Sequence, residues 1–177
     1  MSRPALTVPD LIEHFGLEPL PLEGGFFRPT WTAPKERDER PEGTAIIALL
    51  TAEDEQFSAM HRLPVDEIWH FYLGDPIELL LLHPDGKDRT VVLGTDVLAG
   101  QQIQMCVPAG TWMGGRVRDG GEWSLFGCTM APGFVFSDYE GGDAEELCVR
   151  YPRAAAQIRS RCRPGVPLRV ENGKPAG

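Results

Sequence analysis

The sequence predicts an all-β sandwich or barrel that carries short helices near both ends, and three observations indicate it. The 177 residues suit a single domain with its own core. The 20 glycines and 16 prolines indicate many tight connections, which a helical bundle does not need. Short apolar segments are separated by turn-forming clusters, without the alternating helical patterns of βαβ units.

One short helix is expected over residues 8–15. Its apolar residues recur at helical spacing, Asp10 lies near its start, and Gly16 ends the pattern. An aromatic-rich strand is predicted to follow at residues 26–31. The charged, proline-flanked segment 33–43 has no apolar periodicity, so we expect a mobile loop there.

After this loop the chain becomes a series of short apolar segments, each bounded by glycine, proline or aspartate clusters. Pro84-Asp85-Gly86 is typical of a hairpin turn. The expected strands after the loop cover residues 44–51, 57–63, 67–73, 77–83, 90–93, 103–107, 124–130 and 134–136.

The C-terminal part is expected to be helical over residues 143–149 and 152–161, where apolar residues are spaced among charges. The proline-containing tail 163–177 is either flexible or adds a strand around residues 166–170. The domain organisation is therefore one domain over residues 1–162 with a C-terminal tail over 163–177.

Charge and apolar content exclude several classes of protein. Seventeen Lys and Arg against 26 Asp and Glu give a net charge of −9, which disfavours nucleic acids and anionic membranes. No apolar run reaches the roughly 20 residues that span a bilayer. Asp10 and Glu13 stand where a signal peptide needs an apolar core. We therefore expect a cytoplasmic protein whose four cysteines are reduced.

The segment 58–76 holds the strongest candidates for chemistry. Residues an even number apart on a strand share a face. Glu67, Trp69 and Phe71 should therefore face one side, and His70 the other. We expect His70 on the outer face of the barrel or at a dimer interface.

His61 and Glu67 each allow two interpretations. His61 has apolar neighbours, so it is either a core histidine that bonds a backbone carbonyl or a residue of a pocket. An inward Glu67 needs a partner, since burying a carboxylate alone costs several kcal/mol. That partner would be His61, Arg28 or a ligand, and the alternative is a purely structural ion pair.

The spacing of these residues resembles the first motif of the cupin superfamily, G-x5-H-x-H-x3,4-E-x6-G. His61, Glu67 and Gly74 match its first histidine, its glutamate and its final glycine. Leu63 stands where the second histidine should be.

The segment 100–113 is similar to the second cupin motif, G-x5-P-x-G-x2-H-x3-N. Pro108 and Gly110 match P-x-G, although the gap from Gly100 is two residues longer than in the motif. Met113 replaces the final histidine.

The wider chain, from about Leu11 to Ile158, resembles one cupin subgroup. This is the small, largely uncharacterised group catalogued as the fifth cupin family, similar in fold to RmlC-type sugar epimerases. Leu20-Pro21 departs from the His-Pro that this family often has before its Glu-Gly-Gly. The segments that carry the resemblance are residues 11–31, 61–82, 92–115 and 126–147.

The resemblance implies a jelly-roll barrel, a double-stranded β-helix, that forms a homodimer and has a ligand pocket inside the barrel. It places His61 and Glu67 as the catalytic pair. Arg28 is the best positive charge for an anionic substrate group, and its alternative is a surface ion pair. The expected substrate-binding residues are Phe27, Arg28, Ser58, Trp69, Gln104, Trp112 and Phe134.

In metal-dependent cupins three histidines and the glutamate hold the ion, so only His61 and Glu67 remain here as metal ligands. Zinc and iron sites usually take three or more protein ligands. We therefore expect no cofactor, with a divalent metal on His61 and Glu67 as the alternative.

Three functions remain open. The first is a metal-independent isomerase, epimerase or hydrolase acting on a small polar metabolite, with His61 as base and Glu67 as its orienting group or as the acid. The epimerases of similar fold work without metal, although their His-Asp-Tyr arrangement cannot be traced in this sequence. The second is a non-catalytic ligand-binding cupin, and the third is a metal-dependent cupin enzyme.

Overall fold

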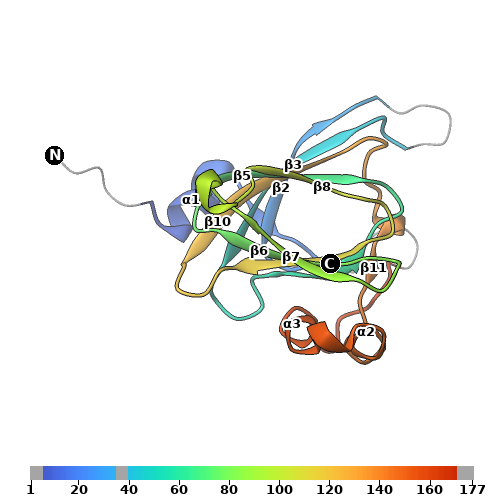
Figure 1. Ribbon diagram of the computed structural model, residues 1–177. Coiled ribbons are helices and arrows are strands. Elements are labelled where there is room, and N and C mark those ends of the chain that lie inside the picture. Colours follow the sequence, from blue (N-terminus) through green and yellow to red (C-terminus); the bar gives the residue numbers. More distant parts are fainter. Residues whose placement is uncertain (1–5, 35–39, 171–177) are drawn as a thin grey trace.

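Two β-sheets face each other and enclose the apolar core (Figure 1). The structure is a computed structural model that describes residues 6–34 and 40–170. The named strands within each sheet pair antiparallel. Most of the predicted strands are confirmed, with ends that differ by one or two residues.

The first sheet has six strands, which lie in the spatial order β1 (Glu18–Pro19), β2 (Phe26–Thr32), β3 (Thr44–Thr51), β10 (Trp123–Met130), β5 (Glu67–Gly74) and β8 (Gln104–Val107). The second has five, in the order β11 (Glu140–Gly141), β4 (Ser58–Arg62), β9 (Trp112–Val117), β6 (Ile77–Leu82) and β7 (Asp88–Leu93).

Alternating side chains build the core between the sheets. On β5, Glu67, Trp69 and Phe71 are buried, whereas His70 is only half-buried and Tyr72 is exposed. This is the alternation expected from the sequence. Within the core the indole ring of Trp69 stacks on Phe126 of β10, with ring centroids 4.7 Å apart.

Helix α1 (Val8–Phe15) has the predicted bounds and covers part of the outer face of the six-stranded sheet. Thr7 and Asp10 form a capping box at its start. Gly16 ends it with a φ of 59°, a left-handed conformation that glycine adopts without strain. Leu11 is the buried residue of the helix and packs in a cluster with Leu49 and Leu125.

Two C-terminal helices, α2 (Ala144–Arg150) and α3 (Ala155–Arg159), lie against the outer face of the five-stranded sheet (Figure 1). The short 3₁₀ helix η3 (Pro152–Ala154) joins them. Trp112 of β9 is buried in the cluster that these helices form with the sheet. The C-terminal helices therefore form a layer outside the five-stranded sheet.

Two predictions for this half of the chain were wrong. The strand expected at residues 134–136 is absent, and the 3₁₀ helix η2 (Phe136–Asp138) begins there. Strand β9 was not expected, because Gly114 and Gly115 weaken strand propensity. The structure gives a reason for Gly114, since a Cβ there would lie 2.6 Å from the sulfur of Met60.

The described part of the tail folds back onto the barrel. Leu168 accepts a backbone hydrogen bond from Gly141 of β11, 2.7 Å long, and Arg169 forms a single bridge with Glu140. The tail therefore adds one bridge and not a full strand, and residues 171–177 lie outside the described residues. The same holds for residues 35–39 of the predicted mobile loop.

In the short 3₁₀ helix η1 (Val97–Ala99), which precedes β8, Leu98 is almost fully exposed. Across residues 6–34 and 40–170, no helix has the length and apolar character needed to cross a membrane.

Candidate functional site

A cavity of about 230 Å³ lies among the barrel strands, between β2, β3, β4, β5 and β10. Apolar side chains form most of its wall, and two carboxyl groups and one imidazole, from Glu23, Glu67 and His61, line it as well. The full lining consists of Leu20, Glu23, Phe27, Pro29, Trp31, Thr32, Pro41, Thr44, Ala45, Ile46, His61, Leu63, Glu67, Cys128, Met130, Phe134 and Phe136.

His61 lies on β4 and is 2% exposed. Its Nδ1 lies 2.7 Å from the carbonyl oxygen of Ala59. Because a carbonyl can only accept, Nδ1 must carry the hydrogen and donate it. In the neutral ring the lone pair then lies on Nε2, and no described residue hydrogen-bonds that atom. Both interpretations of His61 therefore apply, since one ring nitrogen bonds the backbone and the ring also lines the cavity.

Glu67 begins β5 and is 8% exposed. The indole N–H of Trp69 donates to its Oε2 at 2.9 Å. Burial raises the pKa of the Glu67 carboxyl group above its usual range, and the His61 ring acts in the opposite direction. Within the described residues, Glu67 forms no ion pair with Lys or Arg. Of the expected partners, His61 acts on Glu67 through its charge and Arg28 does not reach it, while the hydrogen bond comes from an indole.

Glu23 is a third ionisable residue of the site, and it lies in the turn before β2. Its Oε1 accepts a 2.6 Å hydrogen bond from the Ser58 hydroxyl group and lies 4.0 Å from Nδ1 of His61. The neighbouring Gly24 has a φ of 99°, which other residues rarely adopt, and a Cβ there would lie 2.6 Å from a backbone oxygen. This glycine lets the turn pass close to β4 and brings Glu23 beside His61.

Tyr139 packs against the ring of His61. The two rings stack at 16° with centroids 5.4 Å apart. Burial, followed by the nearby Glu23 carboxylate, raises the pKa of the Tyr139 phenol far above its usual value, so it stays protonated. This stacking holds the plane of the His61 imidazole.

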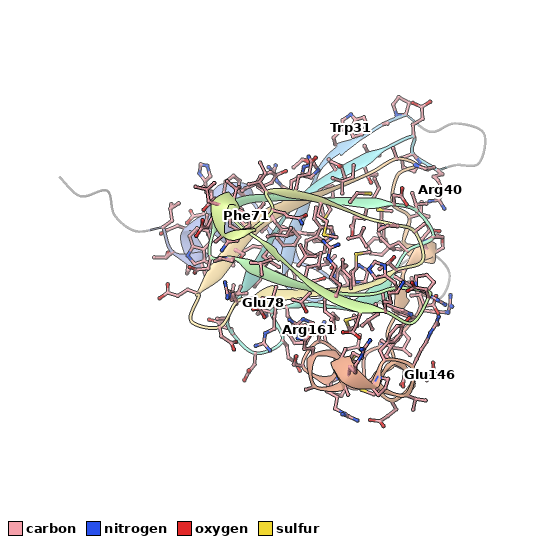
Figure 2. All side chains as sticks on the ribbon, viewed as in Figure 1. Trp31, Arg40, Phe71, Glu78, Glu146 and Arg161 are labelled. Atoms are coloured by element: carbon pink, nitrogen blue, oxygen red, sulfur yellow. The ribbon has the colours of Figure 1, made fainter. Side chains whose placement is uncertain are left out.

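Aromatic side chains form the wall nearest the projecting hairpin of β2 and β3. Figure 2 shows Trp31 on this hairpin and Arg40 at the same end of the molecule. Phe134 and Phe136 meet edge to face at 5.1 Å. Arg40 holds their segment in place, because its guanidinium bonds both oxygens of Asp138, at 2.7 and 3.0 Å, and also the carbonyl oxygen of Gly133.

The predicted site residues fall into three groups. His61, Glu67, Phe27 and Phe134 line the cavity. Trp69 and Ser58 lie behind it and hold the two carboxyl groups of the site by hydrogen bonds. The other three, Arg28, Gln104 and Trp112, lie elsewhere.

The side chains of those three residues lie outside the cavity because they point to the other face of their strands. Arg28 is exposed on the face of β2 opposite to Phe27. Gln104 is exposed on β8, where its amide lies 3.0 Å from Nδ1 of His70. Trp112 faces the C-terminal helices, under the guanidinium of Arg62, whose central carbon lies 4.6 Å from the indole ring centroid. The structure thus separates Arg28 from any ligand inside the barrel.

His70 lies on the outer face of the sheet, as the alternation predicted. Its Nε2 lies 2.9 Å from the Thr129 hydroxyl oxygen, and burial lowers the pKa of the ring. It is therefore separated by the sheet from Glu67.

The donor set does not fit the metal centre of metal-dependent cupins. Leu63 lines the cavity with a hydrocarbon side chain, and Met113 pairs with His61 across β4 and β9 but is packed in the core. Within the described part of the chain, no group of three His, Cys, Asp or Glu residues is arranged to hold an ion.

Sequence reasoning missed Glu23, Tyr139 and Cys128. Burial, followed by the charge of Glu67, raises the pKa of the Cys128 thiol well above its usual value, so it stays protonated. The sequence did offer an indication for Glu23, because this residue begins the Glu-Gly-Gly segment that belongs to the family resemblance. Nothing in the sequence indicated that Tyr139 stacks on His61.

Comparisons with known proteins agree with this architecture. Residues 9–141 match the family described as Cupin_5, Cupin superfamily (DUF985). An uncharacterized protein from Saccharomyces cerevisiae is 26% identical over 156 residues, which cover 77% of each chain.

Two solved structures are similar over most of the chain. A protein from Shewanella oneidensis is 33% identical, with a TM-score of 0.82, over 90% of this chain and 99% of its own. A hypothetical protein from Leishmania major is 29% identical, with a TM-score of 0.79, over 89% of this chain and 99% of its own. The sheets and short helices described above are thus the cupin fold, and the chain belongs to the Cupin_5 (DUF985) family of the cupin superfamily.

Proposed function

We propose that this cupin binds a small polar metabolite in the barrel cavity and acts on it as a metal-independent isomerase, epimerase or hydrolase. The observation that carries the proposal is the burial of an imidazole and a carboxyl group in the wall of one cavity. His61 lines the cavity with its Nδ1 bonded to the backbone, and Glu67 has a carboxyl group whose pKa is raised by burial. A base and an acid side by side are what proton transfer requires.

In this scheme His61 removes a proton from the substrate or from a water molecule through Nε2. Its Nδ1–H remains bonded to the carbonyl of Ala59, which stabilises the imidazolium that forms. Glu67 donates a proton to the substrate atom that gains negative charge, and the Trp69 N–H stabilises the resulting carboxylate. Glu23 stabilises the imidazolium by its charge at 4.0 Å.

A second candidate is a non-catalytic ligand-binding cupin. The mainly apolar lining of the cavity favours it, because such walls hold a ligand without promoting any reaction. A metal-dependent enzyme is not favoured by the donor set, since Leu63 and Met113 replace two ligands.

The test incubates the protein with pooled aldoses, ketoses, amino acids and small esters, once in D₂O and once in H₂¹⁸O. An isomerase or epimerase incorporates solvent deuterium at carbon, and a hydrolase incorporates ¹⁸O into its product. We expect one such mass shift with the wild-type protein and its loss in His61→Gln and in Glu67→Gln. His83→Gln, outside the cavity, should keep it. A mass shift that survives in His61→Gln would contradict the proposal.

For assembly we propose a homodimer, as the family resemblance implies, and for location the cytoplasm, as the charged residues of the N-terminal segment suggest. Apolar side chains that stay exposed near the β8 edge of the six-stranded sheet support self-association. These are Tyr72, Leu73, Val97, Leu98 and Ile103.

A further inference from the structure

The charge of the cavity selects the class of ligand. Among its described lining residues two are acidic, one is histidine, and none is lysine or arginine. A phosphate or carboxylate group placed inside would face Glu23 and Glu67 without a cation to bind it. Like charges brought together in such a site cost several kcal/mol.

Three arginines from segments that flank the cavity lining lie outside it. Arg163 donates to the carbonyl of Leu22 at 3.2 Å and lies 3.7 Å from Glu55. Arg40 is held by Asp138, and Arg28 is exposed outside the barrel. Turning Arg163 or Arg40 into the cavity would break these contacts.

Glu23 and His61 offer acceptor atoms to a ligand in the cavity. Oε1 of Glu23 is an acceptor bonded by Ser58, and Nε2 of neutral His61 is an acceptor without a described partner. His61 is a buried residue that lines the cavity, so this acceptor is open to a donor from a ligand. A protonated amine supplies up to three donors on one atom together with the missing positive charge.

The aromatic walls suit the same kind of ligand. Phe27, Trp31, Phe134 and Phe136 line the cavity and present ring surface to its contents. Aromatic faces attract cations and also pack against hydrocarbon. The volume of 230 Å³ equals that of about eight water molecules at ~30 Å³ each, so the ligand must be small.

We propose that the cavity binds a small organic cation, an amine with an apolar body, whose ammonium group lies between Glu23, Glu67 and Nε2 of His61. This inference rests on the proposed use of the cavity as the ligand site and goes beyond it by naming the ligand class. The ammonium group supplies the cation that both carboxyl groups lack, and its charge favours the ionised form of Glu67 over the protonated form that burial favours in the empty cavity. Anionic ligands are excluded by the same two residues.

The experiment measures binding of three probes of matched size, benzylamine, benzyl alcohol and benzoate, to the whole chain by calorimetry. We expect benzylamine to bind at least about tenfold more tightly than benzyl alcohol, and benzoate to give no binding. Glu23→Gln and Glu67→Gln should each weaken benzylamine binding at least about tenfold. Glu145→Gln, on the exposed surface of α2, should leave it unchanged.

Two results would overturn the inference. One is benzoate binding as tightly as benzylamine, or no binding of benzylamine at all. The other is benzylamine binding that neither Glu23→Gln nor Glu67→Gln weakens, with both variants shown to be folded by their melting curves. The probes undergo no reaction, so the calorimetry tests only the charge preference of the cavity. Isotope incorporation tests only the enzyme activity, and either result can fail without the other.

Discussion

The indole N–H of Trp69 donates a 2.9 Å hydrogen bond to the carboxyl group of Glu67, two residues earlier on the same face of β5. Both side chains point into the barrel because strand residues an even number apart share a face. The stacking of Trp69 on Phe126 holds the donor in place. This contact keeps a nearly buried carboxyl group directed at the cavity where no lysine or arginine is available.

Replacing Trp69 by Phe tests this relationship. The ring still stacks on Phe126, but the hydrogen bond that favours the ionised carboxylate is lost, so the pKa of Glu67 should rise further. Titration of the ¹³C-labelled Glu67 carboxyl group by NMR measures the shift. Trp123→Phe is the control and should leave this pKa unchanged. A Glu67 pKa that stays the same in Trp69→Phe would remove the assigned role of the indole.

Glu67 should also make stability depend on pH. Its pKa is raised on folding, so the folded protein binds more protons than the unfolded chain. The contribution is fully present below the unfolded pKa, and it is lost as the pH rises through the folded pKa. From pH 4.5 up to the folded pKa of Glu67, the free energy of unfolding should therefore fall more steeply in the wild type than in Glu67→Gln. The difference is at most about 1.4 kcal/mol per pH unit.

Urea unfolding at half-unit pH steps measures both slopes, and Glu145→Gln should follow the wild type. Parallel curves for the wild type and Glu67→Gln would show that Glu67 titrates alike in the folded and unfolded states.

Much of the fold could be predicted because local patterns decide it. The apolar spacing, the capping Asp10 and Gly16 set α1, and the apolar segment 44–51 set β3. Alternation placed His70 on the opposite face from Glu67. Such patterns act within a few residues and do not depend on distant packing.

The site was harder to predict because it depends on contacts between distant segments. Trp112 lies on a strand with two covered faces, so its pattern could not indicate whether it faces the core or the C-terminal helices. Arg28 was assigned to the ligand from its charge alone, although Phe27 takes the inward position. Glu23 reaches His61 only because Gly24 lets the chain turn closely past β4.

Elemental analysis of untagged, chelator-free protein checks the metal prediction. We expect far less than one equivalent of iron, manganese, copper or zinc per chain, because Leu63 and Met113 supply no suitable ligand. The double variant Leu63→His with Met113→His should gain a tightly bound metal by restoring the missing imidazoles. One equivalent of metal in the wild type would contradict the metal-independent mechanism.

Light scattering at micromolar concentration checks the assembly. We expect the mass of two chains, and Leu98→Asp should shift the protein toward the monomer by adding charge to the exposed apolar residues near β8. The matched change Val149→Asp, on an exposed apolar residue of α2, should leave the dimer intact. A wild-type monomer would contradict the proposed homodimer.

The most direct test of the account is the protonation of the His61 ring, because acid–base chemistry needs a lone pair on Nε2. Long-range ¹H–¹⁵N NMR of labelled imidazoles, with His61→Gln for assignment, reports which nitrogen carries the hydrogen. The account predicts that in the neutral ring the hydrogen is on Nδ1, bonded to Ala59, and that Nε2 is unprotonated. Finding the hydrogen on Nε2 of the neutral ring would contradict it, because the cavity would then hold no base at His61.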